Sequence, residues 1–242
     1  MARADGRGAN ELRTIRIEPG FFPSAEGSAL VSFGKTRVAC AVSVEDKVPP
    51  FLKGKGQGWI TAEYGMLPRS TSTRTSREGT RGPSGRTHEI QRLIGRSLRA
   101  VTNLQALGER TLWIDCDVLG ADGGTRTASI TGAFVALVLA MEHLRKRNLF
   151  EKIPVSDHVA AVSVGLLASE ALLDLCYDED LKARVDMNVV MSGKGRFIEV
   201  QGTGEESTFE RAELDRMLEL AATGIGRIVE IQKTTLGGVF RP

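Results

Sequence analysis

Alternating apolar and polar residues fill the first third of the chain and predict β-strands there. The alternation covers 14–18, 28–33, 36–44 and 58–64. Gly34-Lys35 separates the second run from the third, which predicts a hairpin. From Leu67 to Gly85 the periodicity disappears, and Ser, Thr, Arg and Gly dominate. A connection of this length inside a domain is either functional or disordered, and we interpret it as functional because its arginines are spaced along it.

Two helices are predicted in the middle of the chain. Ile90, Leu93, Ile94, Leu98 and Val101 recur at helical spacing, which predicts a helix that begins after Thr87 and puts Arg86 at its N-terminus. A strand with inward residues at 112, 114, 116 and 118 follows, and then a turn over 120–124. The second helix, about 127–147, is apolar on nearly every side, so we expect it to be central and buried.

The last third of the chain predicts a second sheet and a final helix. Strands are expected over 158–167, 172–177, 185–191 and 196–201, with a hairpin at 192–195. Ser207 with Glu210 has the spacing of a capping box for the final helix. No Pro-, Gly- or Ser-rich linker divides the chain. We therefore expect one α+β domain over 1–242, built from two similar halves, roughly 1–150 and 151–242.

Charge is distributed unevenly along these elements. The chain has 242 residues, 41% of them hydrophobic, and a net charge of +2, so neither disorder nor a nucleic-acid partner follows from composition alone. Between Arg69 and Arg99, however, eight arginines stand against two glutamates, and between Glu170 and Asp186 six acids stand against two basic residues. The first stretch suits phosphates and the second suits metal cations. The alternative is that both are solvated faces.

The cysteines and the hydropathy of the chain bear on its cellular compartment. Cys40, Cys116 and Cys176 are widely spaced in apolar runs, as is typical of reduced core residues. We see no apolar signal segment and no run of about 18 apolar residues, so we expect a cytoplasmic protein without a membrane span. The three histidines lack the paired spacing of a zinc site.

Two predicted helix starts carry an arginine beside glycine. They are Gly85-Arg86-Thr87 and Gly123-Gly124-Thr125-Arg126. Free backbone N–H groups and the positive end of the helix dipole attract anions there, and a guanidinium adds bidentate hydrogen bonds to phosphate oxygens. Together the two turns can hold one phosphate; taken singly, each also reads as a plain helix cap.

The candidate acids lie in the second half. Strand alternation puts Asp186 and Asn188 on the face opposite Val185 and Met187, while Asp180 ends the acidic run 178–180. Two carboxylates near a bound phosphate can hold Mg²⁺ or Mn²⁺, and one can donate a proton to a leaving 3′ oxygen. Surface aspartates have the same pattern. Asp115 and Asp117, opposite Cys116, have no assigned role.

Longer segments resemble the bacterial ribonuclease PH family of phosphorolytic 3′ exoribonucleases. The resemblance runs from Asp5 to about Lys233, and its clearest segments are 51–54, 56–69, 89–100, 121–132, 185–191 and 199–203. It implies a ribosomal-protein-S5-domain-2-like fold with duplicated βαβα units, assembled as a homohexameric ring built from dimers. It also implies trimming of tRNA precursors and other RNA 3′ ends with inorganic phosphate as co-substrate, release of nucleoside diphosphates, and the reverse polymerisation.

The same resemblance implies roles for individual residues. The phosphate-binding residues would be Arg86, Gly124, Thr125 and Arg126. Asp180 matches the general acid and Asp186 the metal-binding carboxylate, and both are candidate ligands of the divalent cation, Mg²⁺ or Mn²⁺. The RNA-binding residues would be Arg69, Arg74 and Arg77. Gly120, where the family commonly has glutamine, is a departure beside the phosphate turn.

Two other functions share some of these residues. A catalytically silent, RNA-binding ring subunit needs the arginines but not Arg86, Arg126 and both aspartates together. A hydrolytic, metal-dependent nuclease needs the acids but has no use for a phosphate site. Analysis of the products separates the three hypotheses.

Overall fold

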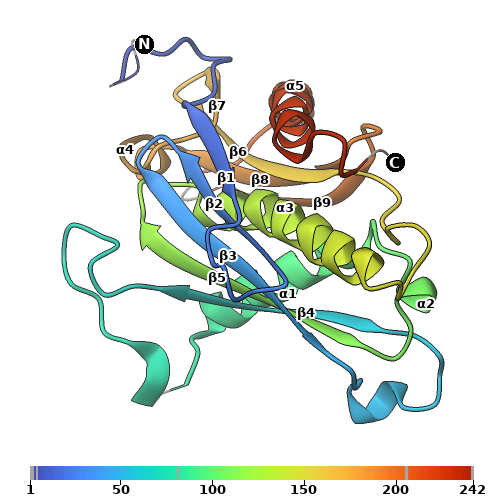
Figure 1. The fold of residues 1–242 in the computed structure, drawn as a ribbon. Coiled ribbons are helices and arrows are strands. Elements are labelled where there is room, and N and C mark those ends of the chain that lie inside the picture. The colour runs from blue at the N-terminus through green and yellow to red at the C-terminus, as the bar shows by residue number, and fades with distance from the viewer. Residues whose placement is uncertain (1–2, 4, 81, 205–206, 241–242) are drawn as a thin grey trace.

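Two antiparallel-rich sheets form the framework of the protein. The computed structural model describes residues 3, 5–80, 82–204 and 207–240 (Figure 1), and Arg81, one of the eight arginines counted above, lies outside them. The first sheet has the order β1-β2-β3-β5-β4, and the second has the order β7-β6-β8-β9. All pairs are antiparallel except β4 with β5. The strands are β1 (Ile15–Pro19), β2 (Gly27–Phe33), β3 (Thr36–Glu45), β4 (Trp59–Met66), β5 (Thr111–Gly120), β6 (Val159–Leu167), β7 (Glu170–Leu173), β8 (Val185–Ser192) and β9 (Phe197–Gly204).

Helices lie between the sheets and on one outer face. They are α1 (Gly85–Arg99), α2 (Leu104–Leu107), α3 (Thr125–Lys146), α4 (Tyr177–Asp180) and α5 (Arg211–Leu236), with short 3-10 turns η1 (Pro50–Leu52) and η2 (Glu78–Thr80). Figure 1 shows α3 between the two sheets and α5 on the far side of the second sheet. Side chains of α1 reach β9, since Arg96 pairs with Glu199 at 2.7 Å. Buried side chains from both halves form one continuous core.

The position of α3 explains its composition. It is long and apolar enough to cross a membrane by those two measures alone, but 89% of its most apolar window is buried inside the protein. Gly132 brings it close to the first sheet, because a Cβ there would lie 2.6 Å from Val31. On its other side, the hydroxyl of Thr131 accepts the Ala161 N–H of β6 at 3.3 Å. Because α3 packs against other elements on two sides, it needs apolar residues around most of its circumference. The predicted central, buried position of this helix is confirmed.

Most predicted elements are confirmed, and the differences are local. The helix expected after Thr87 begins at Gly85, because the Ser84 hydroxyl accepts the Thr87 N–H and caps it. The final helix is capped by Glu210 with Glu213, not by Ser207 with Glu210; the Ser207 hydroxyl donates instead to the Arg184 carbonyl oxygen. These two corrections leave the helix faces unchanged.

The strand predicted over 172–177 is wrong in its second part. β7 ends at Leu173, and the chain turns into α4 at Tyr177. Asp174 causes the break, since it has a positive φ of 54° and a wholly buried carboxylate bound to Arg13. Such an ion pair with a distant arginine leaves no trace in hydrophobic periodicity.

The cysteines are core residues, as predicted. All three are free thiols and buried. Cys40 and Cys116 lie on neighbouring strands with their sulfur atoms 3.9 Å apart. Burial raises the pKa of the Cys176 thiol, which disfavours the reactive thiolate.

Candidate active site

The first turns of α1 and α3 carry the two arginines of the candidate phosphate site. Arg86 is the second residue of α1, and Arg126 is the second residue of α3. Gly124 caps α3 in the left-handed conformation, with φ 66° and ψ 29°, a conformation that favours glycine. Both arginines therefore belong to first helical turns, whose unpaired backbone N–H groups attract an anion.

Arg126 connects the start of α3 to α1 and to the second sheet. Its Nη1 donates to the Gln201 side-chain oxygen at 2.6 Å and to Glu89 at 3.2 Å. Gln201 in turn donates to the same Glu89 oxygen at 2.6 Å. Because the Arg126 side chain is only 14% exposed, these contacts hold it in one orientation.

Tyr64 lies beside the start of α3. Its hydroxyl makes a 2.9 Å hydrogen bond with the Thr125 hydroxyl. Burial raises the pKa of Tyr64, while the positive charges of Arg86 and Arg126 both act to lower it. The Tyr64–Thr125 bond joins β4 to the first residue of α3, and the Glu89–Arg126 contact joins the first turn of α1 to that of α3.

The β8–β9 ladder brings Asp186 to the same region. Asn188 lies opposite Gln201, and Asp186 opposite Thr203. Residues two apart on a strand point to the same face, so Asp186 and Asn188 project toward the face on which Gln201 meets Arg126. The predicted outward orientation of Asp186, opposite Val185 and Met187, is confirmed: both of those are buried in the core and Asp186 is half-buried.

Asp180 lies on a separate turn, α4. It is the last residue of α4, is exposed, and donates its backbone N–H to Cys176. The start of α4 lies against the turn before α3, since the Tyr177 N–H donates to the Asp122 carboxylate at 3.4 Å. Gly123 makes this approach possible: a Cβ there would lie 2.6 Å from the Leu175 carbonyl oxygen.

A cation at this site would take few ligands from side chains. Among the described residues, no group of three or more His, Cys, Asp or Glu side chains is placed to hold a metal. Two aspartates beside a phosphate still fit Mg²⁺, which keeps several waters and takes phosphate oxygens as ligands. The donor set therefore fits a cation bound together with substrate.

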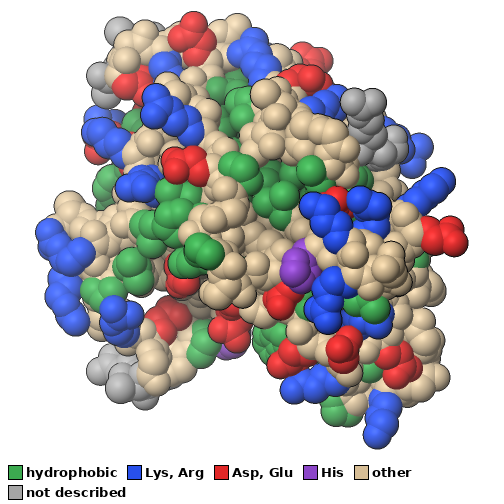
Figure 2. Space-filling model, viewed as in Figure 1, with side chains coloured by type: hydrophobic (Ala, Val, Ile, Leu, Met, Phe, Trp, Pro, Cys, Tyr) green, Lys and Arg blue, Asp and Glu red, His purple; other side chains and the backbone are tan. Residues whose placement is uncertain are grey.

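The three loop arginines lie on a projecting segment between β4 and α1. Arg69, Arg74 and Arg77 are all exposed, and Figure 2 shows Lys and Arg side chains gathered over this part of the surface. The base of the loop is ordered by hydrogen bonds, because Ala121 N–H donates to the Ser70 carbonyl at 2.7 Å. At its other end Thr87 donates to Glu78 at 2.8 Å. Both ends thus attach next to the starts of α1 and α3.

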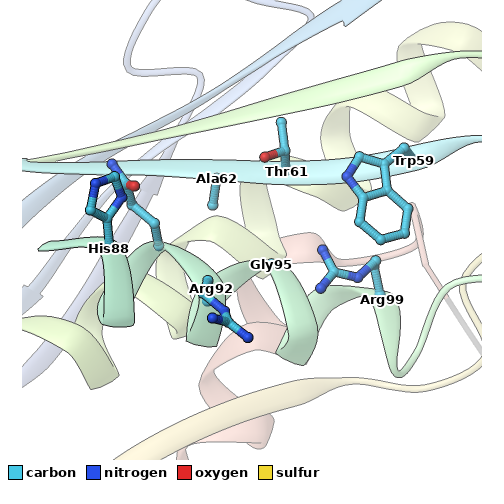
Figure 3. Close-up of a pocket in the computed structure, with 8 residues that line it drawn as sticks. Trp59, Thr61, Ala62, His88, Arg92, Gly95 and Arg99 are labelled. Atoms are coloured by element: carbon cyan, nitrogen blue, oxygen red, sulfur yellow. The ribbon is translucent and has the colours of Figure 1, made fainter. Parts of the chain in front are cut away.

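A basic groove of about 280 Å³ runs between β4 and α1 (Figure 3). Arg99 stacks on the Trp59 ring at 4.3 Å and donates to the Ile60 carbonyl at 2.6 Å. Burial lowers the pKa of Arg99, which indicates a partly desolvated charge. Of the residues that the structure describes, none of those lining this groove is acidic; they are Trp59, Thr61, Ala62, His88, Gln91, Arg92, Gly95 and Arg99. One wall of the groove is α1, the helix that also carries Arg86. Its basic lining favours anionic ligands.

Asp115 and Asp117 lie away from the helix starts. They alternate with the buried Ile114, Cys116 and Val118, so they project from the opposite face of the first sheet. Burial, and then the charges of Glu63 and Asp117, raise the pKa of Asp115. These acids belong to a different face from the candidate site.

Sequence reasoning missed three residues of the site. Tyr64, Glu89 and Gln201 contact Thr125 or Arg126, yet no motif assigns chemistry to them. The available signal was their position inside the resembling segments 56–69, 89–100 and 199–203.

Comparison with known proteins agrees with this geometry. The 3′ exoribonuclease family matches the chain twice, with its domain 1 over residues 11–141 and its domain 2 over residues 157–224. Ribonuclease PH of Syntrophomonas wolfei is 60% identical over 238 residues, which cover 98% of this chain and 100% of that protein. Ribonuclease PH of Bacillus mycoides is 59% identical over 239 residues, covering 98% of each.

Solved structures show the same fold. Rice Rrp46 superposes with a TM-score of 0.79 at 22% identity, covering 97% of this chain and 100% of that one. A chain of the Archaeoglobus fulgidus exosome with RNA bound to the active site gives 0.80 at 23% identity, covering 94% and 91%. The predicted α+β fold with duplicated halves is therefore confirmed.

The fold and its paired helix starts define the class, an RNase PH-like α+β protein with two related halves. The chain belongs to the 3′ exoribonuclease family. The activity that follows from this membership is phosphate-dependent removal of nucleotides from RNA 3′ ends.

Proposed function

We propose that this enzyme trims the 3′ ends of tRNA precursors by phosphorolysis and, in reverse, acts as a tRNA nucleotidyltransferase. The relatives that support this proposal are named ribonuclease PH. The observation that supports it is the contact between the first turns of α1 and α3: Glu89, three residues after Arg86, accepts a hydrogen bond from Arg126 at 3.2 Å. Two guanidinium groups at two helix starts suit a free phosphate co-substrate, which a hydrolytic nuclease does not need.

The phosphate occupies the space between the two helix starts. Arg86 and Arg126 bind its oxygens, and the backbone of Gly124 and Thr125 brings N–H groups close to it. One phosphate oxygen attacks the phosphorus of the terminal phosphodiester, and the bond from that phosphorus to the 3′ oxygen of the preceding nucleotide breaks. The products are a nucleoside diphosphate and an RNA one nucleotide shorter. The protein's contribution is positioning and charge stabilisation.

The carboxylates act on the leaving side. Asp180 donates a proton to the departing 3′ oxygen. Asp186, with Asp180, would hold a divalent cation, Mg²⁺ or Mn²⁺, which supplies charge neutralisation when bound. Asp186 is supported for this role by its place on the face that Arg126 contacts.

The loop arginines hold the RNA upstream of the cut. Arg69, Arg74 and Arg77 present exposed charges next to the base of the site, and contacts of this kind bind the backbone without reading sequence. We also propose a homohexameric ring built from dimers, which is supported by likeness to the archaeal exosome core. Three free thiols support a cytoplasmic location.

Product analysis tests the proposal. An RNA with a 3′ overhang is incubated with the purified protein, with and without inorganic phosphate, and its nucleotide products are separated. Nucleoside diphosphates that appear only with phosphate are the expected result. Monophosphates without phosphate indicate hydrolysis, and unshortened RNA indicates a binding subunit; either result contradicts the proposal.

A further inference from the structure

One buried guanidinium joins the two halves of the chain beside the candidate active site. Arg13, just before β1, is 6% exposed. Its Nε and Nη2 donate to the two carboxylate oxygens of Asp174, at 3.0 and 2.7 Å, and its backbone N–H donates to the same carboxylate at 2.8 Å. Burial acts to lower the pKa of Arg13, but its bonds with Asp174 outweigh this and raise it. Arg13 therefore stays charged while it binds both carboxylate oxygens of Asp174.

The same guanidinium shapes the turn that starts α3. Arg13 Nη1 donates to the Asp122 carbonyl, and Nη2 donates to the Gly123 carbonyl at 3.4 Å. Thr36, also buried, donates its hydroxyl to the Gly123 carbonyl at 2.7 Å and accepts the Asp122 N–H at 2.9 Å. Arg13 and Thr36 thus hold the backbone immediately before Gly124, where the phosphate-binding residues begin.

Asp174 belongs to the other turn, the one that leads into α4. It stands two residues before Cys176, the N-cap residue of α4. Its φ of 54° is uncommon for a residue with a side chain, and its carboxylate is wholly buried. A backbone conformation of this kind persists when the surroundings impose it. Arg13 binds the Asp174 carboxylate, while Arg3 and Arg7 donate to the Asp174 carbonyl oxygen.

Further contacts lock α4 onto this network. Arg3 donates to both carboxylate oxygens of Glu179 at 2.7 Å and to the Asp174 carbonyl at 2.9 Å. Glu179 accepts the Cys176 N–H at 3.0 Å, which closes the first turn of α4. Asp180 is the next residue, so its position follows that of the turn.

We propose that Arg13 and Asp174 are a positioning pair, which sets the phosphate-binding turn 122–126 and the acid-bearing turn 174–180 at the separation that phosphorolysis requires. In this proposal neither residue contacts the substrate. The inference rests on the proposed function, because it assigns meaning to the distance between the phosphate residues and Asp180.

The test uses variants that keep the charge or the shape of a side chain but remove the paired hydrogen bonds between Arg13 and Asp174. Arg13→Lys leaves a single point charge that cannot serve both turns, and Asp174→Asn keeps shape but loses the ion pair. Each should lower kcat by about 10- to 100-fold, since small misplacements of reacting groups have effects of that size. Thr36→Val removes the hydroxyl that bonds the α3 turn and accepts from Arg13 at 3.5 Å, but it leaves the bonds between Arg13 and Asp174 in place. It should therefore raise the KM for inorganic phosphate severalfold with a smaller change in kcat.

Controls separate positioning from loss of stability. Ile228→Ala removes side-chain volume from the buried face of α5 and changes none of the hydrogen bonds described above. Arg145→Lys weakens the pair with Glu142 at the opposite end of α3. Both should keep wild-type kcat and phosphate KM at temperatures where they are folded. RNA affinity, measured without phosphate, should stay within about twofold of wild type in Arg13→Lys.

The outcomes are distinguishable. Two results together support the pair. The first is the difference between the kcat and KM effects described above. The second is a kcat of the double Arg13 and Asp174 variant that is no lower than that of the slower single variant. Folded variants with kinetics within about twofold of wild type overturn it, as does an equal kinetic loss in Ile228→Ala at a matched loss of Tm. If Arg13→Lys does not fold, Asp174→Asn and Thr36→Val decide by the same criteria. Wild-type protein that releases no nucleoside diphosphate contradicts the proposed function itself, and the pair with it.

Discussion

Arg126 at the start of α3 lies 3.2 Å from Glu89 on α1, so an ion pair spans the two helix starts that form the candidate phosphate site. Glu89 is partly exposed, and its charge competes with phosphate for the same guanidinium. Gln201 holds Arg126 from another side at 2.6 Å, so the arginine stays oriented when Glu89 loses its charge.

Glu89→Gln should therefore lower the KM for phosphate. An exposed ion pair is worth about 0.2–1 kcal/mol, which corresponds to a decrease of roughly 1.5- to 5-fold. Initial rates over a range of phosphate concentrations measure it. An increase in KM would show that Glu89 orients Arg126 more than it competes.

Arg86→Ala should raise the phosphate requirement. Loss of a charged hydrogen bond of about 1.5–3 kcal/mol lowers kcat/KM for phosphate by roughly 10- to 100-fold. Arg145→Ala, at the far end of α3, is the matched control and should leave phosphate dependence unchanged. An unaltered dependence in Arg86→Ala removes that residue from the site.

Asp180→Asn should lower kcat by about 10²- to 10⁴-fold, because a general acid contributes that much. An RNA whose scissile 3′ oxygen is replaced by sulfur has a better leaving group that needs no proton. We expect this substrate to restore most of the rate in Asp180→Asn. If the sulfur substrate is equally slow, Asp180 is not the acid.

Replacing Arg69, Arg74 and Arg77 together by alanine should weaken RNA binding and flatten its dependence on salt. Each phosphate contact with a single strand contributes about 0.7 to the slope of log K against log salt, so the slope should fall by about two. Binding titrations at several salt concentrations measure this. A parallel shift with an unchanged slope would assign the loss to something other than phosphate contacts.

Asp115→Asn should stabilise the protein at neutral pH. Burial and neighbouring acids raise the folded-state pKa of Asp115 above its unfolded value of 3.8, so ionisation disfavours the folded state once pH exceeds that value. The Tm gain should be present at pH 7 and disappear below about pH 3.8, where the carboxyl is protonated in both states. Glu219→Gln, an exposed change on α5, is the control and should show no such pH-dependent gain.

The start of α1 at Gly85 shows what hydrophobic spacing along the sequence predicts and what it does not. Hydrophobic spacing over 90–101 predicts α1 and its buried face, and both are confirmed. The first residue depends on one Ser84 hydroxyl, which sequence spacing does not resolve. The end of β7 depends on still more distant information, because Arg13 lies 161 residues from Asp174.

By itself the sequence determined most of the strands, the three long helices and the family, because periodicity and long matching segments are properties of neighbouring residues. Only the tertiary structure decided that Arg126, Glu89 and Gln201 meet on the sheet face that carries Asp186. It also decided that Arg13 spans the turns before α3 and α4. Those relationships depend on how the two sheets enclose α1 and α3, and such packing joins residues that are far apart along the chain.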